Sequence, residues 1–194
     1  MEKSLKNDSN SELYRRFLDG DDDSFTAIVN ANKNALIRFI AAITGDVNDA
    51  EDIAIDTFAV LMSRQKSLDE NVLFKTLLFA IGKNLAYKYL KKHREKPLSL
   101  DESQLDEIWA EAGNPSFEED FLRLDDKAHL PVYMRRLKAN YTSVLHLLFF
   151  EGLSYAEAGK VMGKTEGQIR GLVHRAKETL KNLYESGEWA NAKR

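Results

Sequence analysis

Hydrophobic residues recur every three or four positions over the first half of the chain, which is the spacing of a buried stripe on an α-helix. Within residues 11–44, one helix is expected at the start and a second is expected to carry the apolar positions Leu36, Phe39, Ile40 and Ile43. Gly45 and Asp46 then interrupt the pattern, and Asp46 or Asn48 is placed to cap the helix that follows.

Two further helices are predicted before residue 96. Residues 49–64 form the first, and its acidic first turn suits the positive end of a helix dipole. Its expected buried stripe consists of Ile53, Phe58, Leu61 and Met62. The polar segment 65–71 follows as a loop, and residues 72–93 form a long helix whose end becomes basic.

The last third of the chain has the pattern of two short helices joined by a tight turn. Ser154 and Glu157 have the spacing of a capping box, which predicts a helix over Tyr155–Met162. Thr165 is placed to cap a second helix over residues 166–183. The residues expected in the turn and in the contact between the helices are Gly163, Gly159, Ala158, Met162, Ile169 and Leu172.

This helix-turn-helix leaves a polar and basic outer face. Arginine and glutamine are side chains that hydrogen-bond to guanine and adenine in the major groove, so the face is a candidate DNA-binding surface. The alternative is a helical hairpin whose charges are only solvated. The candidate residues are Lys164, Thr165, Gln168, Arg170, Gly171, His174, Arg175 and Lys177.

Charge is segregated along the chain, although the total of 28 basic and 31 acidic residues gives a net charge of −3. Residues 81–96 carry six Lys or Arg and one Glu, and residues 160–181 carry six Lys or Arg and two Glu. Residues 97–126 carry ten Asp or Glu and one Arg. We therefore predict an all-α chain of two small helical domains, residues 1–96 and 115–194, joined by an acidic linker, residues 97–114.

The sequence gives little support to a catalytic site or a metal site. The chain has no cysteine, which excludes disulfides and thiolate zinc sites. Its four histidines are scattered, and no Gly-rich phosphate loop occurs, so neither an enzyme, a metal site nor a cofactor is expected. The N-terminus has no apolar leader and no apolar run is long enough to span a bilayer, which predicts a cytoplasmic protein.

Two blocks of sequence resemble a known family. "GDVNDAEDIAIDTFAVLM" and "FKTLLFAIGKNLAYKYLKK" resemble region two of bacterial RNA polymerase sigma factors of the extracytoplasmic-function (ECF) group. "NYTSVLHLLFFEGLSYAEAGKVMGKTEGQIRGLVHRAKETL" resembles their region four. The chain departs from the family pattern at Ile55, where Gln is frequent, and at Lys88, where Asp is frequent.

The resemblance implies a promoter-specificity subunit with three binding surfaces. The residues that match the polymerase-binding motif are Asp49, Glu51, Asp52, Asp56 and Phe58. Those that match the helix binding the minus-ten promoter element are Lys83, Asn84, Tyr87, Lys88 and Lys91, and the loop 66–71 matches one that holds a flipped base. The eight outer-face residues of the helix-turn-helix match the surface for the minus-thirty-five element. Implied partners are core RNA polymerase and promoter DNA, and family members are often held inactive by an anti-sigma factor.

Parts of this pattern also have explanations that involve no binding to DNA or polymerase. Tyr87 and Tyr89 alternate with lysines, which suits single-stranded DNA, but both rings could instead pack in a core. The acidic stretch that begins near Asp46 could be an ordinary solvated helix start. A stand-alone helix-turn-helix regulator is the alternative function, although such proteins usually dimerise and no dimer seam is evident.

Overall fold

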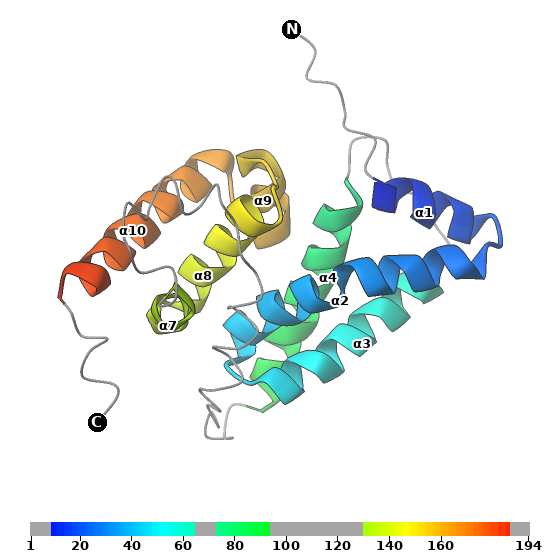
Figure 1. Ribbon diagram of the computed structural model, residues 1–194, viewed down its shortest axis with the longest axis horizontal. Helices are drawn as coiled ribbons and strands as arrows, with labels where there is room; N and C mark the ends of the chain where they lie inside the picture. The colour runs from blue at the N-terminus through cyan, green and yellow to red at the C-terminus, as the bar shows by residue number, and fades with distance from the viewer. Residues whose placement is uncertain (1–8, 65–72, 94–129, 187–194) are drawn as a thin grey trace, which may run out of the picture.

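The computed structural model describes residues 9–64, 73–93 and 130–186, and within these ranges it consists of helices joined by short turns (Figure 1). The first group of helices comprises α1 (Ser9–Leu18), α2 (Asp22–Thr44), α3 (Val47–Ser63) and α4 (Phe74–Lys92). The second comprises α7 (Leu130–Arg136), α8 (Ala139–Leu145), the π-helical turn η2 (His146–Phe150), α9 (Tyr155–Met162) and α10 (Glu166–Glu185). The all-α prediction is confirmed, while the loop 66–71 and the linker 97–114 lie outside the described residues.

Short polar side chains set the ends of the first helices. Asp21 accepts a hydrogen bond from the Ser24 backbone N–H and so begins α2, which then runs unbroken to its end. Gly45 stops α2 with a φ of 76°. Asp46, and not Asn48, caps α3 by accepting the Asp49 N–H at 2.9 Å.

An aromatic core joins the four N-terminal helices. Tyr14, Phe39, Phe74 and Phe79 are fully buried. The Tyr14 hydroxyl donates to the Arg64 carbonyl at 2.9 Å, which ties α1 to the end of α3. Desolvation by burial raises the pKa of Tyr14, so this donor stays protonated.

Met62 is the exception to the predicted buried stripe of α3, since it is 52% exposed. The buried stripe instead includes Thr57, which the prediction left out and which is fully buried between Ile53 and Leu61. The Thr57 hydroxyl donates to the Ile53 carbonyl at 2.7 Å, and this bond satisfies it inside the core. Because successive helical residues are rotated by roughly 100°, Met62 points away from the face that Leu61 buries.

The helix-turn-helix forms as its pattern predicts. Ser154 and Glu157 make a reciprocal capping box at the start of α9. Gly163 ends α9 with a φ of 66°. A Cβ on Gly159 would lie 2.6 Å from the Lys164 carbonyl oxygen, so only glycine lets the turn fold back this closely.

The two groups of helices pack against each other, α4 against α9 and α2 against α8 (Figure 1). Lys75 of α4 forms an ion pair with Glu151 at 2.8 Å, and the Glu151 side chain is only 6% exposed. His146 is fully buried in this contact, with its ring centroid 5.9 Å from those of both Phe39 and Phe79. None of the helices in the described ranges is both long enough and apolar enough to span a bilayer.

Candidate nucleic-acid interface

The residues predicted for the outer face of α10 all remain accessible, but they divide between two sides of the helix. Gln168 and Arg175 are seven residues apart and therefore lie on one side, two turns from each other. Arg170 and Lys177 have the same spacing, yet Arg170 is rotated by roughly 200° from Gln168. The predicted surface is thus two separate edges with Gly171 and His174 between them.

The edge that carries Gln168 and Arg175 begins in a second capping box. The Thr165 N–H donates to the Gln168 side-chain oxygen at 2.9 Å, and the Gln168 N–H donates to the Thr165 hydroxyl at 3.3 Å. Arg175 lies along the helix surface, its guanidinium 3.5 Å from where a Cβ on Gly171 would stand. The missing side chain at Gly171 leaves room for the Arg175 guanidinium to lie close to the helix.

The opposite edge is engaged inside the protein. The Arg170 guanidinium lies 4.4 Å above the Tyr155 ring and also pairs with Glu166. The Lys177 ammonium lies 4.9 Å from the Phe149 ring. These cation–π contacts fix α10 against α9 and η2.

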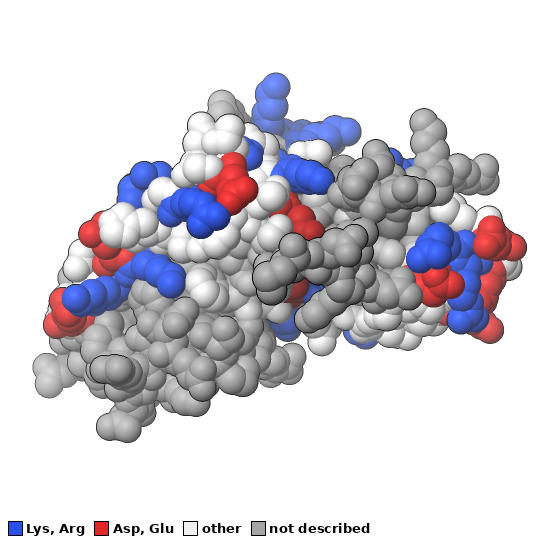
Figure 2. Space-filling view, turned by 90° about the horizontal axis from the view of Figure 1, so that it is seen from above, with Lys and Arg blue, Asp and Glu red and all other residues white. Residues whose placement is uncertain are grey.

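Acidic side chains interrupt the positive charge of this half. His174 lies 3.7 Å from Glu178, and Lys181 lies 3.6 Å from Glu185. Figure 2 shows lysine and arginine side chains spread over the α9–α10 half, at the left, with acidic side chains between them. Charge of this kind attracts phosphate only weakly at a distance, so direct contacts must supply most of the binding to DNA.

On α4 the five predicted residues share one face because of their spacing in the helix. Asn84, Lys88 and Lys91 are exposed, Tyr87 is 46% exposed, and Lys83 is half-buried.

Tyr89 belongs to a different environment. Its ring stacks on His93 at 4.2 Å, and a hydrogen bond to Asp49, together with its burial, raises the pKa of Tyr89 to about 12. Of the two tyrosines, Tyr87 is the more exposed.

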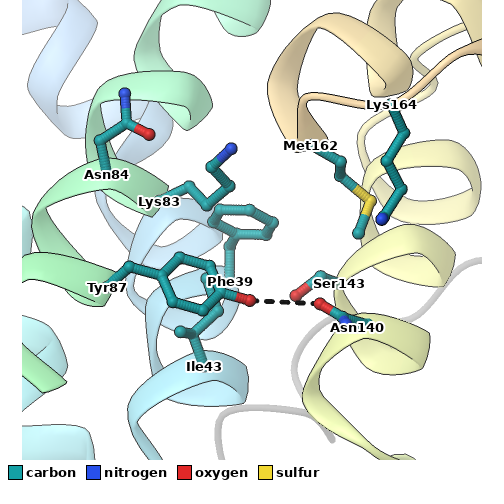
Figure 3. A pocket seen from close by; sticks show the side chains of 9 residues that line it. All are labelled: Phe39, Ile43, Lys83, Asn84, Tyr87, Asn140, Ser143, Met162 and Lys164. Carbon is teal, nitrogen blue, oxygen red and sulfur yellow. Dashed lines mark hydrogen bonds between the residues drawn. The ribbon is translucent and has the colours of Figure 1, made fainter. Parts of the chain in front are cut away.

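The face of α4 also borders a pocket between the two halves of the molecule (Figure 3). Lys83, Asn84 and Tyr87 line it from one side, and Met162 and Lys164 line it from the helix-turn-helix. The Tyr87 hydroxyl donates to the Asn140 side-chain oxygen at 3.2 Å across the gap. The predicted minus-ten and minus-thirty-five surfaces therefore meet here, an arrangement that no local sequence pattern indicates.

The acidic residues of α3 lie on a mixed surface. Glu51, Asp52 and Asp56 are exposed, whereas Asp49 is half-buried at the Tyr89 hydroxyl. Phe58 is only 7% exposed, so its ring supports the core and is not available to a partner. Sequence reasoning missed the exposed apolar residues of this helix, which are Ile55, Val60 and Met62.

Comparison with known proteins identifies the two halves. The family model described as Sigma-70 region 2 matches residues 28–96, and the model described as Sigma-70, region 4 matches residues 133–182. Together the two matches cover more than half of the chain, in the order that the sequence motifs indicate.

Individual relatives agree with these matches. The probable RNA polymerase sigma factor RfaY of Xanthomonas campestris pv. campestris is 29% identical over 163 residues, which are 84% of this chain but only 41% of that protein. The ECF RNA polymerase sigma factor SigM of Bacillus subtilis is 28% identical over 155 residues, or 79% of this chain and 91% of SigM.

A solved structure shares the fold. The sigma factor RpoE of Bartonella quintana, in complex with the anti-sigma factor NepR, has a TM-score of 0.59 at 21% identity, over 83% of this chain and 96% of RpoE. A stand-alone regulator would account for the helix-turn-helix but not for the region 2 match. The chain belongs to the sigma-70 family, in its extracytoplasmic-function group, the class of subunit that gives bacterial RNA polymerase its promoter specificity.

Proposed function

We propose that this chain directs transcription initiation by binding core RNA polymerase and by recognising and melting promoter DNA through α10 and α4. The observation that carries the proposal is the exposed edge of α10, where Gln168 and Arg175 flank Gly171 directly after a capped turn. Arginine pairs with guanine and glutamine with adenine in the major groove, so this edge recognises the minus-thirty-five element. Gly171 allows the helix backbone to approach the base edges.

The remaining residues of α10 take a different part in DNA binding. Arg170 and Lys177 already lie over aromatic rings, so their charged ends face phosphates beside the groove and position the helix. Gln168 is held by its capping contact with Thr165, which fixes its direction before DNA arrives. A preoriented side chain loses less conformational entropy on binding.

The exposed face of α4 binds the minus-ten element. Lys88 and Lys91 contact the phosphate backbone, and the accessible ring of Tyr87 stacks on an unpaired base. Stacking of this kind is worth about 1–3 kcal/mol per base, which offsets part of the cost of melting. Tyr89 supports α4 from the other side and contacts no DNA.

Core polymerase is bound by the surface of α3. Asp52 and Asp56 supply negative charge, and the exposed Ile55 between them supplies apolar area. An apolar centre flanked by charge is typical of a protein interface. Phe58 has no direct contact in this proposal because it is buried.

Transcription reconstituted from purified core polymerase and a promoter library tests the proposal. Initiation at specific sites is expected only when this chain is present. Arg175→Ala should lower minus-thirty-five recognition by about 1–3 kcal/mol and leave core binding unchanged. Lys181→Ala is the matched control, since Lys181 is an exposed cation of the same helix that lies outside the recognition edge. Equal losses in both variants would refute the assignment of that edge.

Binding to core polymerase is tested separately by charge reversal. Asp52→Lys should weaken binding to the isolated core enzyme without lowering the melting temperature, because Asp52 is exposed. Glu185→Lys makes the same change of charge at the end of α10 and should have no effect on core binding. If both reversals weaken binding equally, a general charge effect replaces the α3 interface.

The proposal assigns no catalytic step to this chain, since its groups bind and position DNA. The chain would act in the cytoplasm, where bacterial promoters and polymerase are found. RpoE was solved with an anti-sigma factor, and a similar regulator is a proposed partner here.

A further inference from the structure

The pocket between the two halves has the size and the chemistry of a ligand site. Its volume is about 340 Å³, within the range of small-molecule sites in proteins. A pocket of this volume can hold a small molecule. It is too small for a DNA duplex, which is wider than its own major groove of about 12 Å. Figure 3 shows Lys83 on α4 and Lys164 on the helix-turn-helix pointing into it from opposite sides.

The polar groups in the pocket suit an anion. Two lysines contribute ammonium groups, and Asn84, Asn140 and Ser143 contribute amide and hydroxyl donors. Among the described residues that line the pocket, none carries a carboxylate. Met162 adds an apolar wall that could accept an organic group.

The two ammonium groups repel each other in the unliganded protein. Partial burial and the nearby Lys164 charge together lower the pKa of Lys83. The Lys83 ammonium also lies against the turn, 4.0 Å from where a Cβ on Gly163 would stand. An anion between the lysines would offset both the repulsion and the cost of burial.

We infer that this pocket binds a small phosphate-bearing anion, which bridges Lys83 and Lys164 and holds the two halves of the chain together. A phosphate group matches the site because it carries more than one negative charge and several acceptor oxygens for surrounding donors. Both halves line the pocket, so bound anion stabilises their contact.

A consequence for transcription rests on the proposed function. Lys83, Asn84 and Lys164 belong to the surfaces proposed to contact the promoter. When the anion occupies the pocket, it competes with DNA for these groups, so the ligand would lower promoter binding.

Isothermal titration of the full chain with inorganic pyrophosphate, at constant ionic strength in chloride, tests the inference without polymerase or DNA. We expect saturable one-to-one binding, weakened at least tenfold in Lys83→Gln and in Lys164→Gln. Lys181→Gln, which removes an exposed lysine far along α10, should bind pyrophosphate like the unmodified chain. A parallel titration with ADP separates inorganic from organic phosphate, since tighter ADP binding indicates that the apolar wall is used.

The variants also report on folding. Each substitution removes one of two repelling charges, so the melting temperature without ligand should stay the same or rise. Pyrophosphate should then raise the melting temperature of the unmodified chain and of Lys181→Gln, but not of the pocket variants. The inference would be overturned if pyrophosphate did not bind at millimolar concentration, or if all three variants weakened pyrophosphate binding equally. Those results would leave the proposed function intact, because the transcription assay tests it separately.

Discussion

Acidification should destabilise this protein through one buried histidine. His146 is enclosed by Phe39, Phe79 and Phe150, and its Nε2 lies 3.4 Å from a Glu151 carboxylate oxygen. Burial lowers the pKa of His146 to about 4, although the negative charge of Glu151 opposes this shift. The charges of Arg38 and Lys75 add to the lowering, and a hydrogen bond with the backbone of Ala35 opposes it.

The sign and size of the effect follow from proton linkage. The unfolded chain binds a proton at His146 near pH 6.5, whereas the folded chain resists protonation until about pH 4. The stability that depends on neutral His146 is therefore complete above pH 6.5 and is lost progressively as the pH falls toward 4. Between pH 7.5 and pH 5 the loss should be about 2 kcal/mol.

Urea denaturation at these two pH values measures the loss. His146→Phe places another ring among the three phenylalanines and removes the titrating group. Between pH 7.5 and pH 5, the loss of unfolding free energy in this variant should therefore be smaller than in the unmodified chain by about 2 kcal/mol. His174→Gln is the control, because it removes an exposed histidine from α10 and leaves the buried ring in place. If His146→Phe and the unmodified chain lose the same stability on acidification, the burial argument is wrong.

Three further substitutions test local features of the helix-turn-helix. Gly159→Ala should lower the free energy of unfolding by about 1–3 kcal/mol, since its Cβ would meet the Lys164 carbonyl oxygen. Gly167→Ala, where a Cβ meets nothing within 4 Å, should instead raise it by about 0.5–1 kcal/mol. Ser154→Ala removes the first capping box and should lower the free energy of unfolding by about 1 kcal/mol. Urea denaturation measures all three, and a destabilising Gly167→Ala or a neutral Gly159→Ala would contradict the contacts on which they rest.

The elements that sequence reasoning predicted well are those whose determinants are local. Ser154 with Glu157, Gly45 and Gly163 act within a few residues of themselves, so their pattern fixes helix ends without knowledge of the fold. The prediction that Met62 is buried is wrong, because a hydrophobic residue next to a buried stripe looks like part of that stripe. The burial of Thr57 is missed because its side chain is polar, and only the fold shows that its hydroxyl donates to the Ile53 carbonyl.

The site was predicted only in part for the same reason. Spacing alone put Lys83, Asn84 and Tyr87 on one face of α4. It could not show that this face meets Asn140 and Lys164, which lie more than fifty residues away in the sequence. Long-range contacts depend on how the two halves pack, and that information is spread over apolar residues such as Phe39 that also serve the local core.

The contact between the halves has a consequence for how this net-acidic chain recognises DNA. Elements centred near minus ten and minus thirty-five are about 25 base pairs apart, which is roughly 85 Å along a duplex. Lys83 and Lys164, one from each proposed surface, instead line a single pocket. The proposed function therefore requires the two halves to separate before both surfaces can contact one promoter. Such a separation would break the Lys75–Glu151 ion pair and expose His146, so part of the free energy of polymerase binding would be needed to open the chain. Free chain would then bind promoters weakly because its packed halves cannot place both proposed surfaces on one promoter.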